Sequence, residues 1–585
     1  MSNTIFRLLP IAAVASMLCA CGGGSNNVTA AAASAPAPAS TPAPPAGNKL
    51  LVSRSVYDPG FTVAGQLSFN GNPMGTGTAA SAVDAVTPGG FPNVFTNDAN
   101  DASFGVTAEI YFDQWAPGAT SASQTTDITA LAKQSGFDLS TSFPSKSELA
   151  LNLSLDKTSI TFMGYDAPID QTDISNSNTP GVVDPTNTDV AAPTYRTVAQ
   201  LNLAKNTLTF TRTNAYSGNN GRAAVLANGM YYMVGNAGNS GSNPSPTYGQ
   251  LDMLTTNTGV QSIVPGSSCA FSQVIGAFQS GNGSTYTPAS TGTACSLATM
   301  GSIKDSLAST AYSKKTSYGG NQFGFSLASV SGQVLDKTGK DDNLRGLFVD
   351  PNGTMYVSKG SGGNGVNTVY QVGTTGALAN NGTLPQNATM SIVPGFPTTS
   401  AASLTPSSAT NTPAAWTLSQ GVGYPFGMWV PTNNTSLMFV ADEGDVGTST
   451  YAPSGSGGLW VYQQSGGTWT PIAHITQGLS LGKAYTVTDT SGTYGAAGAN
   501  YTTTPDGLRN ITGQLNSDGS YTIYAVTSTV GNSLGTDFDE GADSNQLVTL
   551  KLTLNGSTVS TSGFTVLQTA PYGQVLRGVA LVPNS

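Results

Sequence analysis

Charged residues are scarce in this sequence, and positive charge is scarcer than negative charge. Only 9% of the 585 residues are Asp, Glu, Lys or Arg, whereas a typical soluble domain contains roughly 25%. The 21 Lys and Arg residues are outnumbered by 31 Asp and Glu residues, which gives a formal net charge of −10. Nucleic acids are held by basic surfaces that neutralise phosphates, so this balance argues against a nucleic-acid partner.

Histidine is almost absent, which removes several kinds of catalytic site. His474 is the single histidine, so a zinc site with two or three histidines is excluded and a Ser-His-Asp triad would depend on this residue alone. We expect His474 in an outer strand, packed or solvated. The sequence also lacks a Gly-x-Ser-x-Gly elbow and a phosphate-binding Gly-x-x-x-x-Gly-Lys-Ser/Thr loop. Paired carboxylates remain open as acid/base groups, so enzymatic activity is left undecided.

Long hydrophobic runs are missing except at the N-terminus. Arg7 is followed by an apolar run, Leu8 to Leu18, which has the length of a signal-peptide core and is too short to span a bilayer as a helix. The run ends in Leu18-Cys19-Ala20-Cys21. An ordinary cleaved signal with an accidental cysteine is the alternative interpretation.

The Leu-x-small-Cys pattern resembles the lipobox of bacterial lipoproteins. The resemblance implies a signal peptide over 1–20, cleavage before Cys21 and acylation of Cys21, which would hold the protein on a lipid bilayer. Gly22, in place of Asp, implies sorting to the outer membrane of a Gram-negative cell envelope. Residues 21–48, rich in Gly, Ser, Ala and Pro, predict an extended tether. Loss of Arg7 with the signal takes the net charge from −10 to −11.

Cysteine usage agrees with an oxidising compartment. Of the 4 cysteines, Cys19 leaves with the signal and Cys21 is the predicted lipidation site. Cys269 and Cys295 remain, and we predict a disulfide between them. A metal site built on these two cysteines would lack histidine partners nearby in the sequence.

Glycine is abundant, at 70 residues, and it falls between short runs rich in Val, Ile, Thr, Tyr and Phe. This alternation predicts an all-β chain. Four segments repeat one pattern of two strands around an Asn/Gly/Asp turn, and a third and a fourth strand follow each pair. In the first repeat these are expected at 248–254 and 260–265, and the fourth strand of the third repeat is expected at 468–475. Four antiparallel strands repeated radially are typical of a β-propeller. The repeats begin at Arg222, Arg345, Phe426 and Arg509.

The ends of the chain predict how the propeller closes. The final run, 575–583, matches the first strand of the repeat and lacks a second strand, whereas 49–57 matches a second strand. We therefore predict one blade shared by the N- and C-terminal strands. A further unit is assigned to 104–216, with Phe104-Gly105 as the start of its first strand. The domain 49–585 is thus predicted to be a six-bladed β-propeller. A seven-bladed one is the alternative, because 268–340 is either an insertion or a degenerate blade.

The run Arg345-Gly-Leu-Phe-Val-Asp-Pro-Asn-Gly-Thr-Met-Tyr-Val357 resembles propellers of the NHL and SMP-30-like type. The resemblance implies the fold. It implies no activity by itself, although some SMP-30-like propellers are Ca²⁺-dependent enzymes.

Basic residues recur at one repeat position. Because first strands line the central channel of a propeller, guanidinium groups at this position would converge near its axis and are candidates to bind a carboxylate or phosphate at the channel mouth. The competing interpretation is that each pairs with a neighbouring Asp and fastens the blades together. The four candidates are Arg222, Arg345, Arg509 and Arg577.

Acidic residues gather in segments predicted to lie on the loop face. Oxygen ligands in such clusters suit Ca²⁺, although none matches an EF-hand loop and solvated turn residues are the alternative. The candidates are Asp98, Asp101, Asp442, Glu443, Asp445, Asp537, Asp539 and Asp543.

Two functions follow from these patterns. The first is an envelope lipoprotein whose propeller binds a ligand or a protein, peptide or glycan partner on its loop face. The alternative is a Ca²⁺-dependent hydrolase, lactonase or lyase that acts at the channel mouth. A structural or adhesive envelope protein is a third hypothesis. Trp429 and Trp460 are candidates for stacking on sugars, or for filling space between blades.

Overall fold

The chain divides into two units, residues 1–46 and 47–585, and a computed structural model describes most of the second unit. The described residues are 48–61, 91–92, 94, 105–116, 118–180, 192–236, 259–267, 344–360, 367–385, 388, 390–398, 416–444, 456–531 and 541–583, with the backbone of three short strands between 273 and 286. Within these ranges, no helix is long and apolar enough to cross a membrane.

Strands dominate the described residues, as the sequence predicts. The α-helix in these ranges, α1 (Ile128–Gln134), begins after Asp127, whose carboxylate accepts a hydrogen bond from the Ala130 N–H at 2.8 Å. This is the usual way in which an N-terminal Asp satisfies a free helix N–H. Three short 3₁₀ segments are η1 (Ile174–Asn176), η3 (Ala379–Asn381) and η5 (Leu418–Gln420).

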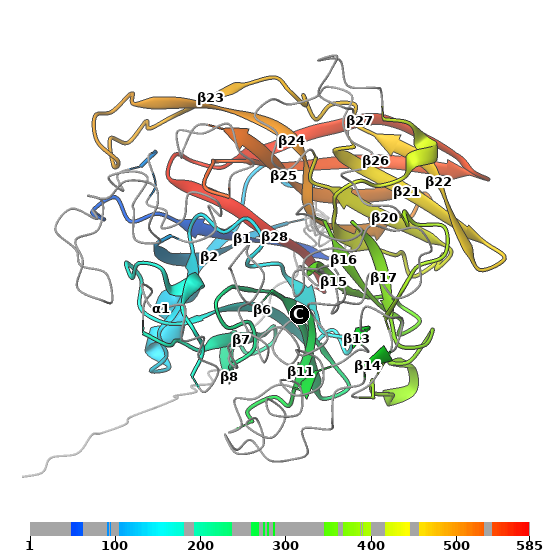
Figure 1. The fold of residues 1–585 in the computed structure, drawn as a ribbon. Coiled ribbons are helices and arrows are strands. Elements are labelled where there is room, and N and C mark those ends of the chain that lie inside the picture. The colour runs from blue at the N-terminus through cyan, green and yellow to red at the C-terminus, as the bar shows by residue number, and fades with distance from the viewer. Residues whose placement is uncertain are drawn as a thin grey trace, which may run out of the picture. The chain divides into compact units, whose positions relative to one another are not determined.

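Four antiparallel sheets follow the chain in simple order (Figure 1). The first holds β9 (Gly221–Ala227), β10 (Met230–Gly235), β11 (Gly259–Ile263) and β12 (Gln273–Val274). The second holds β15 (Leu344–Val349), β16 (Met355–Lys359), β17 (Thr368–Val372) and β18 (Met390–Ile392). The third holds β19 (Pro425–Trp429), β20 (Leu437–Asp442), β21 (Gly458–Ser465) and β22 (Thr468–Ile475). The fourth holds β23 (Tyr485–Thr488), β24 (Asn500–Leu515), β25 (Tyr521–Gly531), β26 (Gln546–Asn555) and β27 (Thr558–Thr569). A separate pair is β13 (Phe278–Gln279) with β14 (Thr285–Tyr286).

The two ends of the described chain pair with each other in the remaining sheet. Strand β1 (Lys49–Val56) lies antiparallel to β28 (Gln574–Val582), with Leu51 opposite Ala580. Figure 1 shows β1 in blue beside β28 in red. The predicted pairing of the terminal strands is therefore present. This sheet continues through β2 (Thr107–Trp115), β4 (Leu139–Ser142), β6 (Ser159–Asp166), β7 (Arg196–Asn202) and β8 (Thr207–Thr213), with β3 (Gln124–Asp127) and β5 (Asn152–Leu153) at its side.

The predicted role of the segment after Phe104 is wrong. Phe104 itself lies outside the described residues, but β2, which follows it, pairs with β1 from Leu50 opposite Trp115 to Val56 opposite Glu109. This segment is thus the third strand of the terminal sheet and not the first strand of a separate one. The assignment relied on the Phe-Gly dipeptide that this segment shares with Phe426-Gly427. Strand pairing depends instead on the buried face of β2, which includes Ile110 and Phe112.

The later repeats match the expected strands more closely. The predicted fourth strand at 468–475 coincides with β22, and the Asn228-Gly229 turn between β9 and β10 has the positive φ angles, 51° and 78°, that this hairpin turn requires. One assignment is wrong: residues 260–265 were expected as a fourth strand, but β11 pairs with β10 and is therefore third in its sheet. The expected third strand, 248–254, lies outside the described residues.

One strand of each sheet, which we call its inner strand, contacts the inner strand of the next sheet. Strand β9 contacts β15, β15 contacts β19, β19 contacts β24, and β24 contacts β28; β28 then contacts β5, which contacts β9. Hydrophobic clusters fill the spaces between successive sheets. One example is the cluster in which Tyr232 of β10 packs with Met355 and Leu384 of the neighbouring sheet.

Glycine permits the close approach of inner strands. A Cβ at Gly346 would clash with the Phe426 carbonyl oxygen of the next inner strand, and a Cβ at Gly578 would clash with the carbonyl oxygen of Leu149. At Gly427 the clash would be with the Arg509 carbonyl oxygen, at 2.8 Å. The Gly that follows Arg or Phe in the repeat is therefore explained by strand-to-strand contact.

Candidate functional site

The segment 143–148, which we call the central strap, is buried and contacts inner strands of several sheets. Arg577 of β28 donates to the Phe143 carbonyl oxygen, and Arg345 of β15 donates to the Ser147 hydroxyl. The amide of Asn220, at the start of β9, donates to the Ser145 hydroxyl at 2.7 Å. The strap therefore brings side chains from distant sheets to one place.

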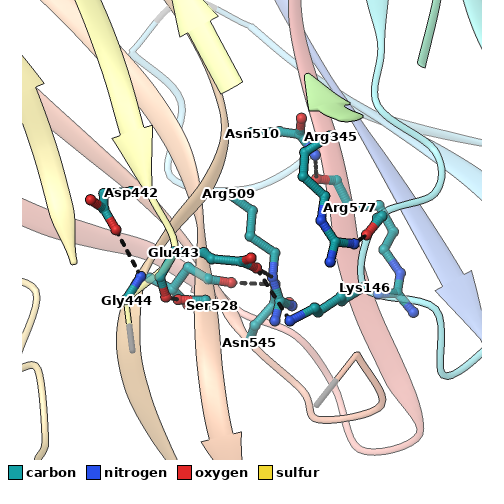
Figure 2. A network of polar contacts seen from close by, with 12 residues as sticks. Lys146, Arg345, Asp442, Glu443, Gly444, Arg509, Asn510, Ser528, Asn545 and Arg577 are labelled. Atoms are coloured by element: carbon teal, nitrogen blue, oxygen red, sulfur yellow. Dashed lines mark hydrogen bonds and ion pairs between the residues drawn. The ribbon is translucent and has the colours of Figure 1, made fainter. Parts of the chain in front are cut away.

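The four arginines predicted at one repeat position are all buried. Arg222 in β9 is 3% exposed, Arg345 in β15 is 5%, Arg509 in β24 is 3% and Arg577 in β28 is 2%. Arg345, Arg509 and Arg577 lie in one network with Lys146 of the central strap (Figure 2). Arg222 instead bonds the Asn220 side chain and the Leu344 carbonyl oxygen, at 2.8 and 2.9 Å, and so links β9 to β15.

Glu443 is the carboxylate on which two of these cations meet. Its Oε2 lies 3.6 Å from Lys146 Nζ and 3.5 Å from Arg509 Nε, and its side chain is fully buried. Its Oε1 has no hydrogen-bond partner among the described residues. Glu443 follows directly on β20, so this carboxylate ties the third sheet to the fourth and to the central strap.

Arg577 is held in an environment that disfavours its charge. Burial, together with repulsion from the nearby Arg509, lowers the pKa of Arg577 to about 9, whereas the Glu148 carboxylate opposes this shift. Its Nε lies 3.4 Å from the Ser55 hydroxyl, and its buried Nη1 has no acceptor in the part of the chain that the structure describes. Buried guanidinium groups are usually paired, so an anion placed here would relieve both the repulsion and the unmet donor.

Glu148, at the end of the central strap, has a full set of donors. It accepts hydrogen bonds from the Thr141 hydroxyl at 2.6 Å, the Ser142 N–H at 2.9 Å and the Tyr165 hydroxyl at 2.5 Å. Burial raises the pKa of Glu148, and these hydrogen bonds oppose the rise. The carboxylate therefore anchors the central strap, and these three hydrogen bonds account for its burial.

Asp442, a predicted metal ligand, fastens the backbone instead. Its Oδ2 accepts from the N–H groups of Gly423 and Tyr424, at 2.7 and 3.1 Å, and its Oδ1 accepts from the Gly444 N–H and the Ser456 hydroxyl, at 3.0 and 3.1 Å. Burial raises the pKa of Asp442 to about 6 against the effect of these bonds. Figure 2 shows Asp442 on the far side of Gly444 from the cluster around Glu443.

The other acidic candidates do not join Asp442 in a described site. Asp543 is buried and accepts a hydrogen bond from the Thr503 hydroxyl at 2.8 Å. Within the described ranges, no three His, Cys, Asp or Glu residues are grouped closely enough to hold a metal ion. The remaining metal candidates lie outside the described residues, as do Cys21, Cys269 and Cys295; those metal candidates are Asp98, Asp101, Asp445, Asp537 and Asp539.

His474, Trp429 and Trp460 pack against neighbouring side chains of the fold. His474 lies in β22, stacks on Trp460 with ring centroids 4.2 Å apart, and its Nε2 lies 3.1 Å from the Gly457 carbonyl oxygen. Burial lowers its pKa. Trp460 is fully buried, and Trp429 packs against Phe439 and Tyr521. Trp460 therefore fills space in the core, whereas Trp429 is half-buried and packs at the edge of a hydrophobic cluster.

Lys146 and the rest of the central strap were missed by the sequence analysis. The stretch Phe143-Pro-Ser-Lys-Ser-Glu148 has no repeat partner and reads as an ordinary polar loop. The one feature of the sequence that could have indicated its role is the presence of two charged residues, Lys146 and Glu148, in a chain where charge is scarce.

Sequence comparison does not assign the chain to a family: no family model matches it and no curated protein matches it. Among solved structures, a glucose dehydrogenase is similar at a TM-score of 0.29, with 10% identity over 78% of this chain and 94% of that one. A Lactobacillus plantarum protein gives 0.30, with 9% identity over 92% and 99%. The Niastella koreensis GH74 enzyme gives 0.25, with 12% identity over 78% of this chain and 65% of the enzyme. TM-scores this low carry no conclusion about activity.

Proposed function

We propose that this chain is a lipid-anchored envelope protein whose 49–585 region is a six-bladed β-propeller that binds an anionic ligand at its centre. The six-blade arrangement is supported by the contacts that run from β9 through β15, β19, β24, β28 and β5 back to β9. It is also supported by the pairing of β1 with β28, which uses both ends of the chain in one sheet.

One observation carries the ligand proposal: the buried guanidinium groups of Arg577 and Arg509 repel each other at the centre of the network. A carboxylate or phosphate between them would accept the free Arg577 Nη1–H in the forked geometry that guanidinium groups favour. Lys146 and Arg509 already share the Glu443 carboxylate, and this contact supports the proposal that cations at this centre hold an anionic group.

Thermal unfolding of the purified mature protein tests this proposal. Phosphate or a dicarboxylate such as succinate is expected to raise the melting temperature more than chloride does at equal ionic strength. The rise should be lost in Arg577→Gln and reduced in Arg577→Lys, which keeps the charge but not the fork. The matched control is Arg212→Gln, because Arg212 pairs with Asp166 at the surface.

Two results would reject the proposal. One is an equal rise in chloride, which would mean general salt stabilisation. The other is a full response in Arg577→Gln when circular dichroism shows that this variant is folded.

The membrane anchor is tested separately. Labelled palmitate should be incorporated into the full-length protein in a bacterial host and not into Cys21→Ala, and only the wild-type protein should enter the membrane fraction. A wild-type protein that is cleaved but found in the soluble fraction would support the ordinary-signal alternative.

The Ca²⁺-dependent enzyme remains the second hypothesis, because five of its eight candidate ligands lie outside the described residues. A shift in melting temperature on addition of Ca²⁺, reversed by a chelator, would support it. The phosphate and Ca²⁺ experiments have independent readouts, so each hypothesis can fail alone.

A further inference from the structure

Asn-Gly pairs lie in or beside turns of several sheets, and they are the asparagines most open to chemical change. Glycine has no side chain to shield its backbone nitrogen, so this nitrogen can reach the Cγ atom of the preceding asparagine. The described part of the chain contains five such pairs, and their surroundings decide which of them can react. The asparagines of these pairs are Asn220, Asn228, Asn352, Asn381 and Asn555.

In two of the pairs the glycine nitrogen is held by a turn. The Gly353 N–H donates to the Asp350 carbonyl oxygen at 2.9 Å, and the Gly382 N–H donates to the Ala379 carbonyl oxygen at 2.9 Å. A nitrogen fixed in this way must break its hydrogen bond before it can turn toward the asparagine side chain. The asparagines that precede these two glycines are therefore protected.

In two further pairs the side-chain amide is held. Asn220 is fully buried, and its amide donates to the Ser145 hydroxyl at 2.7 Å. The Asn228 amide donates to the carbonyl oxygens of Leu378 and Gly382, at 2.8 and 2.7 Å. Deamidation expels the amide nitrogen, so a reaction at either asparagine would break these hydrogen bonds.

Asn555 has neither restraint. It is exposed at the end of β26, and Gly556 begins the turn to β27. Within the described ranges, neither its side-chain amide nor the Gly556 N–H takes part in a hydrogen bond. A Cβ at Gly556 would meet no atom within 4 Å, so water reaches the turn. The Gly556 carbonyl oxygen lies 3.4 Å from Gln463 Nε2 of β21, a contact that connects this turn to the third sheet.

We propose that Asn555 is a modification site, the described Asn-Gly pair at which the folded protein deamidates. The Gly556 nitrogen loses its proton to solvent and attacks Asn555 Cγ, the bond from Cγ to the side-chain nitrogen breaks, and ammonia leaves a cyclic succinimide. Water then opens the ring at either carbonyl and gives aspartate or isoaspartate. Both products add a negative charge to the turn. Isoaspartate also inserts a side-chain carbon into the main chain, which displaces the Gly556 carbonyl oxygen from Gln463.

Peptide mapping of the folded mature protein, incubated at mildly alkaline pH in heavy-oxygen water, tests the proposal. The Asn555 peptide should exchange its side-chain nitrogen for a heavy oxygen. Asn228 is the matched control, because Gly229 also has open space around its Cβ position. Asn228 should react more slowly by roughly tenfold or more, because its two hydrogen bonds must be lost first. In urea the two sites should react at similar rates. Three further pairs outside the described residues are followed as separate peptides: Asn70, Asn282 and Asn364.

Two variants test the effect on the turn. Aged wild-type protein should melt at a lower temperature than fresh protein, whereas aged Asn555→Gln should show a smaller loss, because the longer side chain closes a ring poorly. Asn555→Asp carries the new charge on an unchanged main chain and should melt like fresh wild type. Equal reaction of Asn228 and Asn555 in the folded protein, or an Asn555 peptide that reacts only in urea, would overturn the proposal. Unchanged melting of aged protein that has been converted at Asn555 would reject the effect on the Gln463 contact.

Discussion

Lys146 Nζ and Glu443 Oε2 lie 3.6 Å apart in a buried ion pair that joins the central strap to the end of β20. The strap precedes β5, and β5 and β19 are separated by two inner strands in either direction along the series of contacts. This pair therefore links parts of the fold that no strand pairing connects, and it stabilises their relative placement.

Removal of the shared carboxylate should be strongly destabilising. In Glu443→Gln, Lys146 and Arg509 both lose the negative charge they share, and loss of one partner of a buried pair costs about 3–5 kcal/mol. Lys146→Met should cost less, because Arg509 keeps its contact with Glu443. Urea unfolding of the two single variants and of the double variant gives the coupling free energy. Additive losses would show that the 3.6 Å contact has no energetic role.

The strands were more predictable than the central strap, and the reason is physical. Strand β22 matches its expected bounds because its residues alternate and its turns contain Gly, which are local signals. The burial of Lys146 depends on Glu443, 297 positions away by subtraction of 146 from 443, and no local pattern encodes such a contact. The arginine positions were predictable from the repeat, whereas their partners in the strap were not.

The inner strands should tolerate a Cβ only at positions where the neighbouring strand leaves space for one. Gly346→Ala would place a Cβ against the Phe426 carbonyl oxygen, and overpacking of this kind costs roughly 1–3 kcal/mol. Ala223 occupies the equivalent repeat position in β9, so Ala223→Gly is the matched change at a site that already accepts a Cβ. Chemical unfolding should show the larger loss in Gly346→Ala, and equal stability of this variant and the wild type would contradict the close approach.

Oxidation of Cys269 and Cys295 is a prediction that rests on the sequence. A disulfide across this loop should stabilise the fold by about 3–4 kcal/mol in the chain-entropy model. The mature protein isolated from the envelope should show no free thiol under denaturing conditions until it is reduced, and Cys269→Ser with Cys295→Ser should melt at lower temperature than the oxidised protein. Two free thiols in the untreated protein would exclude the bond.

Asp170 should make stability depend on pH. Burial, followed by interaction with Asp58 and Glu109, raises the pKa of Asp170 to about 7 from a usual value of 3.8. Because the folded state holds this proton more tightly than the unfolded state, its contribution to stability is complete below about pH 4 and is lost as the pH rises to 7.

The variant Asp170→Asn should remove that loss. Asparagine matches the shape of a protonated Asp and tolerates the left-handed backbone at this position, where φ is 62°. The free energy of unfolding should equal that of the wild type near pH 4 and exceed it at pH 8. The gain is roughly 1 kcal/mol, because the group is half-exposed and solvent screens the repulsion. Asp58→Asn should give a smaller gain, because it removes the repulsion but leaves the Asp170 carboxylate buried. Parallel pH profiles for wild type and Asp170→Asn, measured by urea unfolding from pH 4 to 8, would show that the pKa of Asp170 is not raised in the folded protein.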